Sequence, residues 1–370
     1  MTNILTDFKL IQLDLTDSEN LFTDLENSTI FEPITKGRTG ANIMKMTTII
    51  NETKISVPIV RTTTKYQIPN QQFNDLHHMI IKKIQLAINS ISTNTNNLIS
   101  ANFNNALIEI YDNSYTTMGF HSDQSLDLQN NSYIAIFSCY NIDNKIDNID
   151  NIQPHNIRKL IIKKKDSLRQ DKDSLRQDKN SLRQEVDTEE ILLKHNSVLL
   201  FSTETNKKYL HKIVLDLDKT IKPSDTAIKW LGITFRVSKT NIIFNCCKLP
   251  LSLPLFNAKG EEATDTEKAD TEKADTEKAD TEKAGEEAGE EVKKTTLLIQ
   301  PYPIFAQIEQ TDQIEQIDQT EQIEQIKLTM ASPNELKEFY KMRGLENKLI
   351  DFTYPSTISY TISEGDLMIL

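Results

Sequence analysis

Cysteine is scarce in this sequence of 370 residues, and long apolar runs are absent. There are three cysteines, two of them adjacent at Cys246 and Cys247, too few for a disulfide framework or a four-ligand zinc site. No stretch approaches the roughly 18 apolar residues that a membrane-spanning helix needs, and no basic segment followed by an apolar one opens the chain. We therefore expect a soluble, intracellular protein of a reducing compartment, without a membrane partner. The sequence does not indicate an oligomeric state.

Negative charge is concentrated in one stretch of the chain. The formal net charge is −12, and Glu261–Glu291, with fourteen Asp or Glu and four Lys, accounts for −10 of it. The acidic balance therefore describes this stretch and not the remainder of the protein. A hydrophobic fraction of 38% still allows one sizeable core, provided that the polar residues are concentrated in segments that do not fold.

Three short repeats mark segments that we expect to lie outside a folded core. A seven-residue repeat begins at Asp166 and carries one Leu per heptad, which is half of a coiled-coil seam. Four copies of Asp-Thr-Glu-Lys-Ala run through 265–284, and a triplet rich in Ile, Glu and Gln runs through 308–326. None of the three has the continuous apolar face that burial requires, so solvated spacers are expected.

Removing the repeats leaves one main domain and three shorter segments. The main domain contains the heptad insertion; the segments are an acidic linker, a short strand with the triplet repeat, and a C-terminal segment expected to pack on the main domain. The bounds are 1–251 for the main domain, 164–190 for the insertion within it, and 252–294, 295–327 and 328–370 for the three segments. In the last segment, Glu335–Met342 is predicted to be a helix and Ile358–Ile362 a strand.

The apolar runs of the main domain are short and rich in Ile, Val, Phe and Tyr, which is typical of strands. Eight runs are predicted strands: Lys54–Val60, Asn105–Tyr111, Asn131–Ser138, Arg158–Lys163, Ser197–Phe201, Lys212–Leu217, Lys229–Val237 and Thr240–Asn245. Gln71–Ile88 instead has its apolar residues on one face of a helix. A helix followed by about eight strands predicts a mainly β (α+β) fold: a double-stranded β-helix, or jelly-roll, core with a flanking N-terminal helix. The heptad insertion is then expected at a hairpin tip, between the strands at 158–163 and 197–201.

Among six histidines, His121 and His211 stand out by their sequence context. His121 and Asp123 are two residues apart on an extended segment after a predicted strand, so their side chains leave the same face. His211 begins another predicted strand and would supply a third ligand. Such a 2-His-1-carboxylate set leaves open positions on the metal for a bidentate 2-oxo acid and dioxygen. Arg236, on the strand after His211, offers a guanidinium for the far carboxylate of that acid.

Four sequence blocks, in this order, resemble the Fe(II)/2-oxoglutarate oxygenases, and within them the AlkB-like branch. The blocks are Asn105–Tyr111, Gly119–Asp123, Tyr209–His211 and Gly232–Arg236, in a resemblance that covers about Pro58 to Val237. The resemblance implies Fe(II) at His121, Asp123 and His211, with 2-oxoglutarate and dioxygen as cosubstrates. It also implies that Tyr111 hydrogen-bonds 2-oxoglutarate and that Arg236 pairs with one of its carboxylates. The implied reaction is hydroxylation or oxidative demethylation, and the substrate could be alkylated nucleic acid or protein.

Three residues depart from the AlkB-like pattern. Trp230 and Gly232 stand where that branch usually has Arg and Asn, and Glu109 stands where an Asn is usual. Cosubstrate binding would then rest on the two matched residues, Tyr111 and Arg236. The substrate cannot be carried over from the branch, because its substrate-side residues are not matched.

Strand alternation separates Arg236 from a nearby lysine. On the predicted strand 229–237, period-2 alternation points Thr234 and Arg236 to one face and Lys229 to the other. We therefore expect Arg236 to face the metal if that face looks into the barrel. The run Lys163–Lys165 is interpreted as a solvated strand end.

Two other readings compete with an active oxygenase. In the first, His121, Asp123 and His211 fall by coincidence at these positions of a β-sandwich. In the second, a catalytically degenerate double-stranded β-helix serves as an interaction scaffold, with the repeats binding a partner. Metal-dependent decarboxylation of 2-oxoglutarate separates both from the oxygenase.

Overall fold

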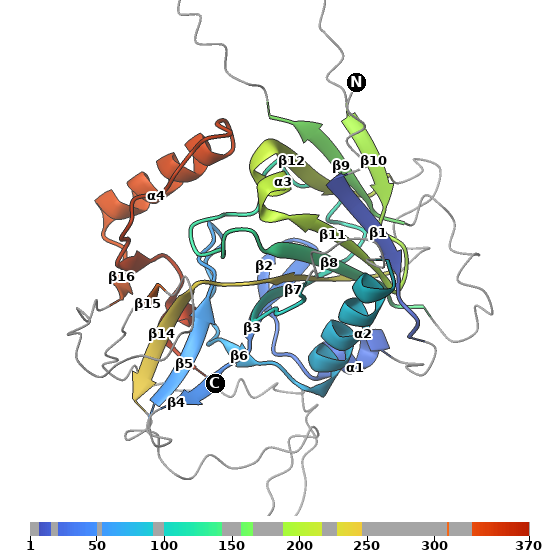
Figure 1. Ribbon diagram of the computed structural model, residues 1–370, viewed down its shortest axis with the longest axis horizontal. Coiled ribbons are helices and arrows are strands. Elements are labelled where there is room, and N and C mark those ends of the chain that lie inside the picture. The colour runs from blue at the N-terminus through green and yellow to red at the C-terminus, as the bar shows by residue number, and fades with distance from the viewer. Residues whose placement is uncertain are drawn as a thin grey trace, which may run out of the picture. The chain divides into compact units, whose positions relative to one another are not determined.

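The computed structural model describes most of the main domain and of the C-terminal segment (Figure 1). The described residues are 7–15, 21–49, 54–91, 100–142, 157–165, 188–216, 228–245, 309–310 and 328–369. The described residues belong to one compact unit within 1–249 and 304–370, and residues 250–303 are not described. Cys246, Cys247 and the three repeats also lie outside the described residues, apart from Glu309–Gln310. No helix within the described ranges is long and apolar enough to cross a membrane.

An eight-stranded, mainly antiparallel sheet forms the larger wall of the domain. Its strands follow the order β1-β11-β8-β13-β7-β3-β2, and β6 pairs with β3 in parallel. Their bounds are β1 (Phe8–Gln12), β2 (Glu32–Thr35), β3 (Arg38–Met44), β6 (Gln71–Gln72), β7 (Asn105–Tyr111), β8 (Tyr133–Tyr140), β11 (Ser197–Ser202) and β13 (Trp230–Arg236). Because β13 lies between β7 and β8, the late block of the sequence is brought beside the two early ones.

A smaller sheet of three antiparallel strands, in the order β10-β9-β12, packs against the larger one (Figure 1). Its strands are β9 (Lys159–Lys164), β10 (Thr188–Leu192) and β12 (Tyr209–Val214). Side chains from both sheets share one buried cluster, to which the larger sheet contributes Ile136 and Phe201 and the smaller sheet Ile162 and Ile213. Two packed antiparallel sheets of this kind form a jelly roll, so the predicted fold class is confirmed.

Helices cover the other face of the larger sheet (Figure 1). The apolar faces of α1 (Leu21–Asn27) and α2 (Asp75–Ile91) join a second buried cluster, which contains Leu25, Ile80 and Phe235. Phe235 therefore points toward the helices, and its neighbours on β13 point into the jelly roll.

The predicted helix at Gln71–Ile88 is present as α2, but it begins later. Gln71–Gln72 are instead paired with β3 as strand β6. The side-chain oxygen of Asn74 accepts hydrogen bonds from the backbone N–H groups of Leu76 and His77, at 3.1 and 3.2 Å. An Asn that satisfies the first free N–H groups of a helix is a typical N-terminal cap, which explains the start at Asp75.

Several strands of the structure were not predicted. A third sheet has the order β15-β14-β5-β4, and its strands are β4 (Thr47–Ile49), β5 (Lys54–Ile59), β14 (Thr240–Asn245) and β15 (Glu309–Gln310). β5 and β14 match predicted strands, whereas β1 to β4 and β10 do not. β10 has the sequence Thr-Glu-Glu-Ile-Leu and pairs with β9 from Lys163 opposite Thr188. The hairpin that carries the heptad insertion therefore returns through β10, and not through the strand predicted at 197–201.

The C-terminal segment contains α4 (Pro333–Glu346), β16 (Thr329–Met330), β17 (Tyr360–Thr361) and the 3-10 helix η6 (Glu364–Leu367). α4 is longer than predicted because Ser332 and Glu335 form a reciprocal capping box around a proline in the first turn. Phe339 of α4 is fully buried in a cluster that also contains Leu126 of the main domain. The packing of this segment thus involves residues close to His121 and Asp123 in sequence.

Candidate active site

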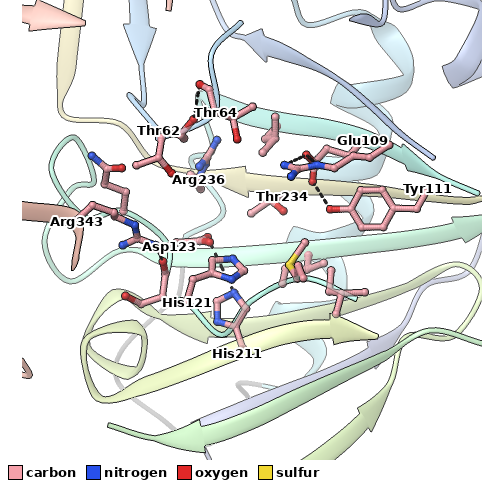
Figure 2. A pocket seen from close by; sticks show the side chains of 18 residues that line it. Thr62, Thr64, Glu109, Tyr111, His121, Asp123, His211, Thr234, Arg236 and Arg343 are labelled. Carbon is pink, nitrogen blue, oxygen red and sulfur yellow. Dashed lines mark hydrogen bonds and ion pairs between the residues drawn. The ribbon is translucent and has the colours of Figure 1, made fainter. Parts of the chain in front are cut away.

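A cavity of about 120 Å³ brings together the residues that the sequence singled out. Its lining includes Tyr111, His121, Asp123, His211 and Arg236 (Figure 2). The inner faces of β7, β8, β12 and β13 contribute to it, together with the connection between β7 and β8. Tyr111, His211 and Arg236 are buried on strands, whereas His121 and Asp123 are half-buried in the connection after β7.

His121 and His211 are joined through their backbones. The N–H of His121 donates to the carbonyl of His211 at 2.9 Å, and the N–H of His211 donates to the carbonyl of His121 at 2.7 Å. This bridge joins the connection after β7 to β12. His211 lies in the middle of β12, whereas the sequence predicted it at the start of a strand. The two imidazole centroids are consequently 4.7 Å apart.

Asp123 completes a compact group with the two histidines. One potential ligand atom from each of the three residues lies within 4.8 Å of the other two, and Nε2 of His211 is 3.8 Å from Oδ1 of Asp123. The side-chain amide of Asn206, in α3 (Thr203–Lys208), is hydrogen-bonded to the backbone of Asp123. Its oxygen accepts from the N–H of Asp123 and its nitrogen donates to the carbonyl of Asp123, both at 2.7 Å.

The electrostatics of this group favour a bound cation. Burial lowers the pKa of His211 to about 3 and also lowers the pKa of His121, so both imidazoles are neutral near pH 7. Nδ1 of His121 lies 3.0 Å from the carbonyl of Gly119, which leaves its Nε2 as the acceptor nitrogen. Oδ2 of Asp123 is buried and has no hydrogen-bond partner among the described residues. Two neutral imidazoles beside an unsatisfied carboxylate oxygen suit a divalent metal such as Fe(II).

Arg236 is a buried cation without a carboxylate partner in the described part of the chain. It is 3% exposed, and its Nη2 donates to the amide oxygen of Asn105 at 3.3 Å, while its Nε has no partner among the described residues. Burial lowers the pKa of Arg236, and the charge of Asp123 acts in the opposite direction. A desolvated guanidinium of this kind suits an anionic ligand.

The predicted alternation along β13 is confirmed. Thr234 and Arg236 both line the cavity, while Nζ of Lys229 pairs with Glu26 at 3.0 Å on α1. Lys229 is therefore directed away from the cavity, as the alternation predicts.

Glu109 is engaged by two neighbours in the cavity (Figure 2). Nε of Arg38 donates to one of its carboxylate oxygens at 2.8 Å, and the same two residues form an ion pair through Nη2. The hydroxyl of Tyr111 donates to the other oxygen at 2.6 Å. The carboxylate that replaces an expected Asn is thus neutralised by Arg38, a residue of β3 that the sequence analysis missed because no motif surrounds it.

Trp230 and Gly232, which stand where the AlkB-like pattern has Arg and Asn, are in close contact with each other. A Cβ atom added to Gly232 would lie 2.1 Å from the indole of Trp230, so the ring occupies the space of a side chain at 232. The indole packs on Tyr111 with ring centroids 4.9 Å apart, within the core between the two sheets. These departures change the packing beside the cavity, and neither residue lines it.

Two further parts of the cavity wall carried no sequence signal. Thr62, Thr63 and Thr64 follow β5, and Arg343 comes from α4 in the C-terminal segment. Arg343 is 9% exposed, and in Figure 2 its side chain reaches toward the segment that carries Asp123. The cavity lining therefore combines residues of the main domain with a residue of the C-terminal segment.

A jelly roll whose cavity holds two neutral imidazoles, a free carboxylate oxygen and a buried guanidinium defines a class of candidate non-haem metal proteins. The family model of the 2OG-Fe(II) oxygenase superfamily matches residues 19–236, which is more than half of the chain. The chain therefore belongs to the 2OG-Fe(II) oxygenase superfamily. Membership implies Fe(II) as the metal and 2-oxoglutarate as cosubstrate.

Solved structures also match the chain, at low sequence identity. One of those that match is described as "The structure of OsALKBH1"; it is 11% identical, and the match covers 62% of this chain and 96% of that chain with a TM-score of 0.34. No curated protein matches the chain.

Proposed function

We propose that this protein is an Fe(II)- and 2-oxoglutarate-dependent dioxygenase, with the metal held by His121, Asp123 and His211. The observation that carries the proposal is the buried, unpartnered Oδ2 of Asp123 beside two imidazoles that burial keeps neutral. Arg236 supports it, because a buried guanidinium without a carboxylate partner in the described chain suits one carboxylate of 2-oxoglutarate.

Each residue has a defined part in this proposal. Bound iron, together with 2-oxoglutarate and dioxygen, would supply the oxidation that hydroxylates or demethylates the substrate: one oxygen atom would enter the substrate and the other succinate, as 2-oxoglutarate loses carbon dioxide. Asn206 fixes the backbone of Asp123, and Gly119 fixes the imidazole of His121, so the ligand atoms are oriented before the metal binds. Tyr111 would contact the cosubstrate only if its hydroxyl exchanges Glu109 for the new partner.

For the substrate, we propose an alkylated nucleic acid. Phe120 directly precedes His121 and is half-buried, and Nζ atoms of Lys163 and Lys212 lie 4.5 and 4.7 Å from its ring centroid. Phe120 and Lys212 directly adjoin His121 and His211, which line the cavity, and strand alternation turns them to the opposite face. There the two lysines are suited to contact the phosphate backbone of a nucleic acid whose modified base enters the cavity.

A second candidate function is a degenerate oxygenase that acts as a scaffold. It is favoured by Glu109, whose carboxylate occupies part of the cavity and holds both Arg38 and Tyr111. If 2-oxoglutarate cannot displace this pairing, the fold and metal site would persist without turnover.

The proposal is tested by metal binding and by succinate formation. Purified protein is expected to bind one Fe(II), and His121→Ala, Asp123→Ala and His211→Ala should each abolish binding, because a three-ligand site cannot lose a ligand and compete with water. Succinate should form from 2-oxoglutarate under oxygen, faster with a methylated single-stranded oligonucleotide than with a methylated peptide. Wild-type metal affinity in the His211 variant would refute the triad. Metal binding without succinate under any condition would favour the scaffold.

A further inference from the structure

Residues at the C-terminal end of α4 are hydrogen-bonded to Ser122, the residue between two of the proposed metal ligands. Ser122 lies between His121 and Asp123, and its carbonyl accepts a hydrogen bond from the guanidinium of Arg343. The amide oxygen of Asn347, which caps α4, accepts from the N–H of Ser122 at 3.1 Å and from its hydroxyl at 3.3 Å. Both backbone groups of Ser122 are therefore fixed by a segment more than 200 positions later in the chain.

One carboxylate connects these contacts to the rest of the loop. Glu346 pairs with Arg343, and its Oε1 accepts from the N–H of Ser125 at 2.8 Å and from the hydroxyl of Ser125 at 2.6 Å. The backbone carbonyl of Glu346 accepts from Nζ of Lys165 at 2.7 Å, at the end of β9. Lys165 is buried, so the expectation of a fully solvated strand end at 163–165 is wrong for this residue.

The rest of the C-terminal segment is anchored beside the same cavity. Arg61 pairs with Asp127 at 2.7 Å, and its Nη1 donates to the carbonyls of Ile358 and Tyr360 at 2.6 and 3.0 Å. Further along, the hydroxyl of Ser363 donates to the carbonyl of Thr64, which lines the cavity, at 3.1 Å. The segment therefore contacts two walls of the cavity, one at 62–64 and one at 121–125.

The 121–125 stretch needs such support because it has little regular structure of its own. It lies within the long connection from β7 to β8, where the described chain has isolated bridges and no helix or strand. Ordering a segment of this kind costs backbone conformational entropy, which fixed hydrogen bonds must offset. Ligand geometry in metal sites is held by partners of just this kind.

We infer that Arg343 and Asn347 are positioning residues, through which the C-terminal segment holds His121 and Asp123 at the spacing that a metal requires. The inference rests on the proposed function in so far as these residues are the ligands. It assigns a role in the metal site to a helix outside the matched family region 19–236. Neither residue would be a metal ligand; both act through the backbone of Ser122.

The test measures binding of Mn(II) alone, a redox-stable probe, to the full chain by calorimetry, and hydrogen exchange in peptides covering 119–127. Arg343→Ala should weaken Mn(II) binding roughly 10- to 100-fold, as loss of a partner that orients a ligand does. Exchange should become faster in 119–127 and stay unchanged in β8 and β13. Arg343→Lys, which keeps a cation and a donor, should recover part of the affinity. Lys341→Ala removes an exposed charge from the same helix and should change neither readout.

A second pair of variants covers the case in which Arg343→Ala fails to fold. Asn347→Asp keeps an acceptor for Ser122 and should retain Mn(II) affinity, whereas Asn347→Leu removes the acceptor and should lose it. Affinities within twofold of wild type for Arg343→Ala and Asn347→Leu, together with unchanged exchange, would overturn the inference; if His211→Ala abolishes binding in the same series, the proposed function still stands. If the unsubstituted chain binds no Mn(II), both the inference and the proposed function are wrong.

Discussion

At the scale of single residues, the cavity holds arginines in two different electrostatic situations. Arg38 is paired with Glu109, and this carboxylate raises the pKa of Arg38 against the opposing effect of burial. Among the described residues, the side-chain partner of Arg236 is the neutral amide oxygen of Asn105, at 3.3 Å. Since a charge buried without a counter-ion is costly, Arg236 is the residue that gains most from an incoming carboxylate.

Arg236→Ala is expected to weaken 2-oxoglutarate binding selectively. Loss of a charge-assisted contact in a buried site costs about 2–5 kcal/mol, because the carboxylate is left desolvated without a partner. The dissociation constant for 2-oxoglutarate, measured without oxygen by calorimetry, should rise roughly 30-fold or more. Metal affinity should change little. The control is Lys229→Ala, which removes a cation directed away from the cavity. If Lys229→Ala abolished binding and Arg236→Ala did not, the assignment would be wrong.

His77 should make stability depend on pH. It is 1% exposed on α2, its Nδ1 accepts from the N–H of Asn74 at 3.1 Å, and burial lowers its pKa to about 4. The unfolded chain, with an ordinary histidine pKa of about 6.5, takes up a proton between pH 6.5 and 4 that the folded chain does not. This histidine therefore costs no stability above that window and lowers stability as the pH falls through it.

The measurement is the free energy of unfolding in denaturant at pH 7 and at pH 5. For wild type, His77 contributes a loss of about 2 kcal/mol between these values. His77→Leu should be less stable at pH 7, because the N–H of Asn74 loses its acceptor, but should lose about 2 kcal/mol less on acidification. An equal loss in both proteins would show that His77 is not neutral and buried as described.

At the scale of elements, the residues of β13 lie in three environments: the core beside the helices, the cavity, and a close contact between Trp230 and Gly232. Phe235 joins the cluster with the helices, whereas Thr234 and Arg236 line the cavity. At the start of the strand, the indole of Trp230 lies across Gly232, which leaves no room for a Cβ. The two departures from the AlkB-like pattern, Trp230 and Gly232, are therefore coupled, because the large ring at 230 requires a glycine at 232.

Gly232→Ala should destabilise the fold by about 1–3 kcal/mol, because the new methyl group would collide with a large ring buried in the core. Trp230→Leu in the same chain should remove the collision, so the cost of the double variant should be smaller than the sum of the two single costs. Denaturant unfolding of the four proteins measures this coupling. Additive costs would mean that the two positions do not constrain each other.

At the scale of the whole molecule, the charge and the packed core lie in different parts of the chain. The stretch Glu261–Glu291 carries −10 of the net charge and lies outside the described residues, whereas the buried clusters and the cavity are formed by described residues of the unit that contains 1–249. The heptad repeat interrupts a hairpin whose strand β9 is also paired with β12. Both repeats can therefore be removed without breaking a described strand pair.

Deleting Asp166–Gln184, or Glu261–Glu291, should leave the melting temperature and metal affinity of the protein close to wild type. Neither repeat has an apolar face for the core, and the free energy of closing a loop changes only slowly with its length. Calorimetry and metal titration of the two deletion proteins provide the check. A fall in melting temperature of more than about 5 °C would correspond to a loss of stability that spacers should not cause.

The sequence by itself determined the features that depend on neighbours along the chain. His121 and Asp123 share a face because they are two positions apart on extended backbone, and α2 has its apolar residues at helical spacing. The strands richest in branched and aromatic residues, such as β7 and β13, were recognisable because burial on both faces leaves a dense apolar run. The jelly-roll fold class followed from these strands.

Only the tertiary structure decided which distant residues complete the cavity. Arg38, Thr64 and Arg343 line it from β3, the loop after β5 and α4, and nothing near them in sequence marks them out. β1 and β10 are strands because each pairs with a more apolar partner, β11 and β9 respectively. The physical reason is the same in both cases: burial and hydrogen bonding are shared between segments remote in sequence, so a side chain's role depends on partners that no local pattern contains.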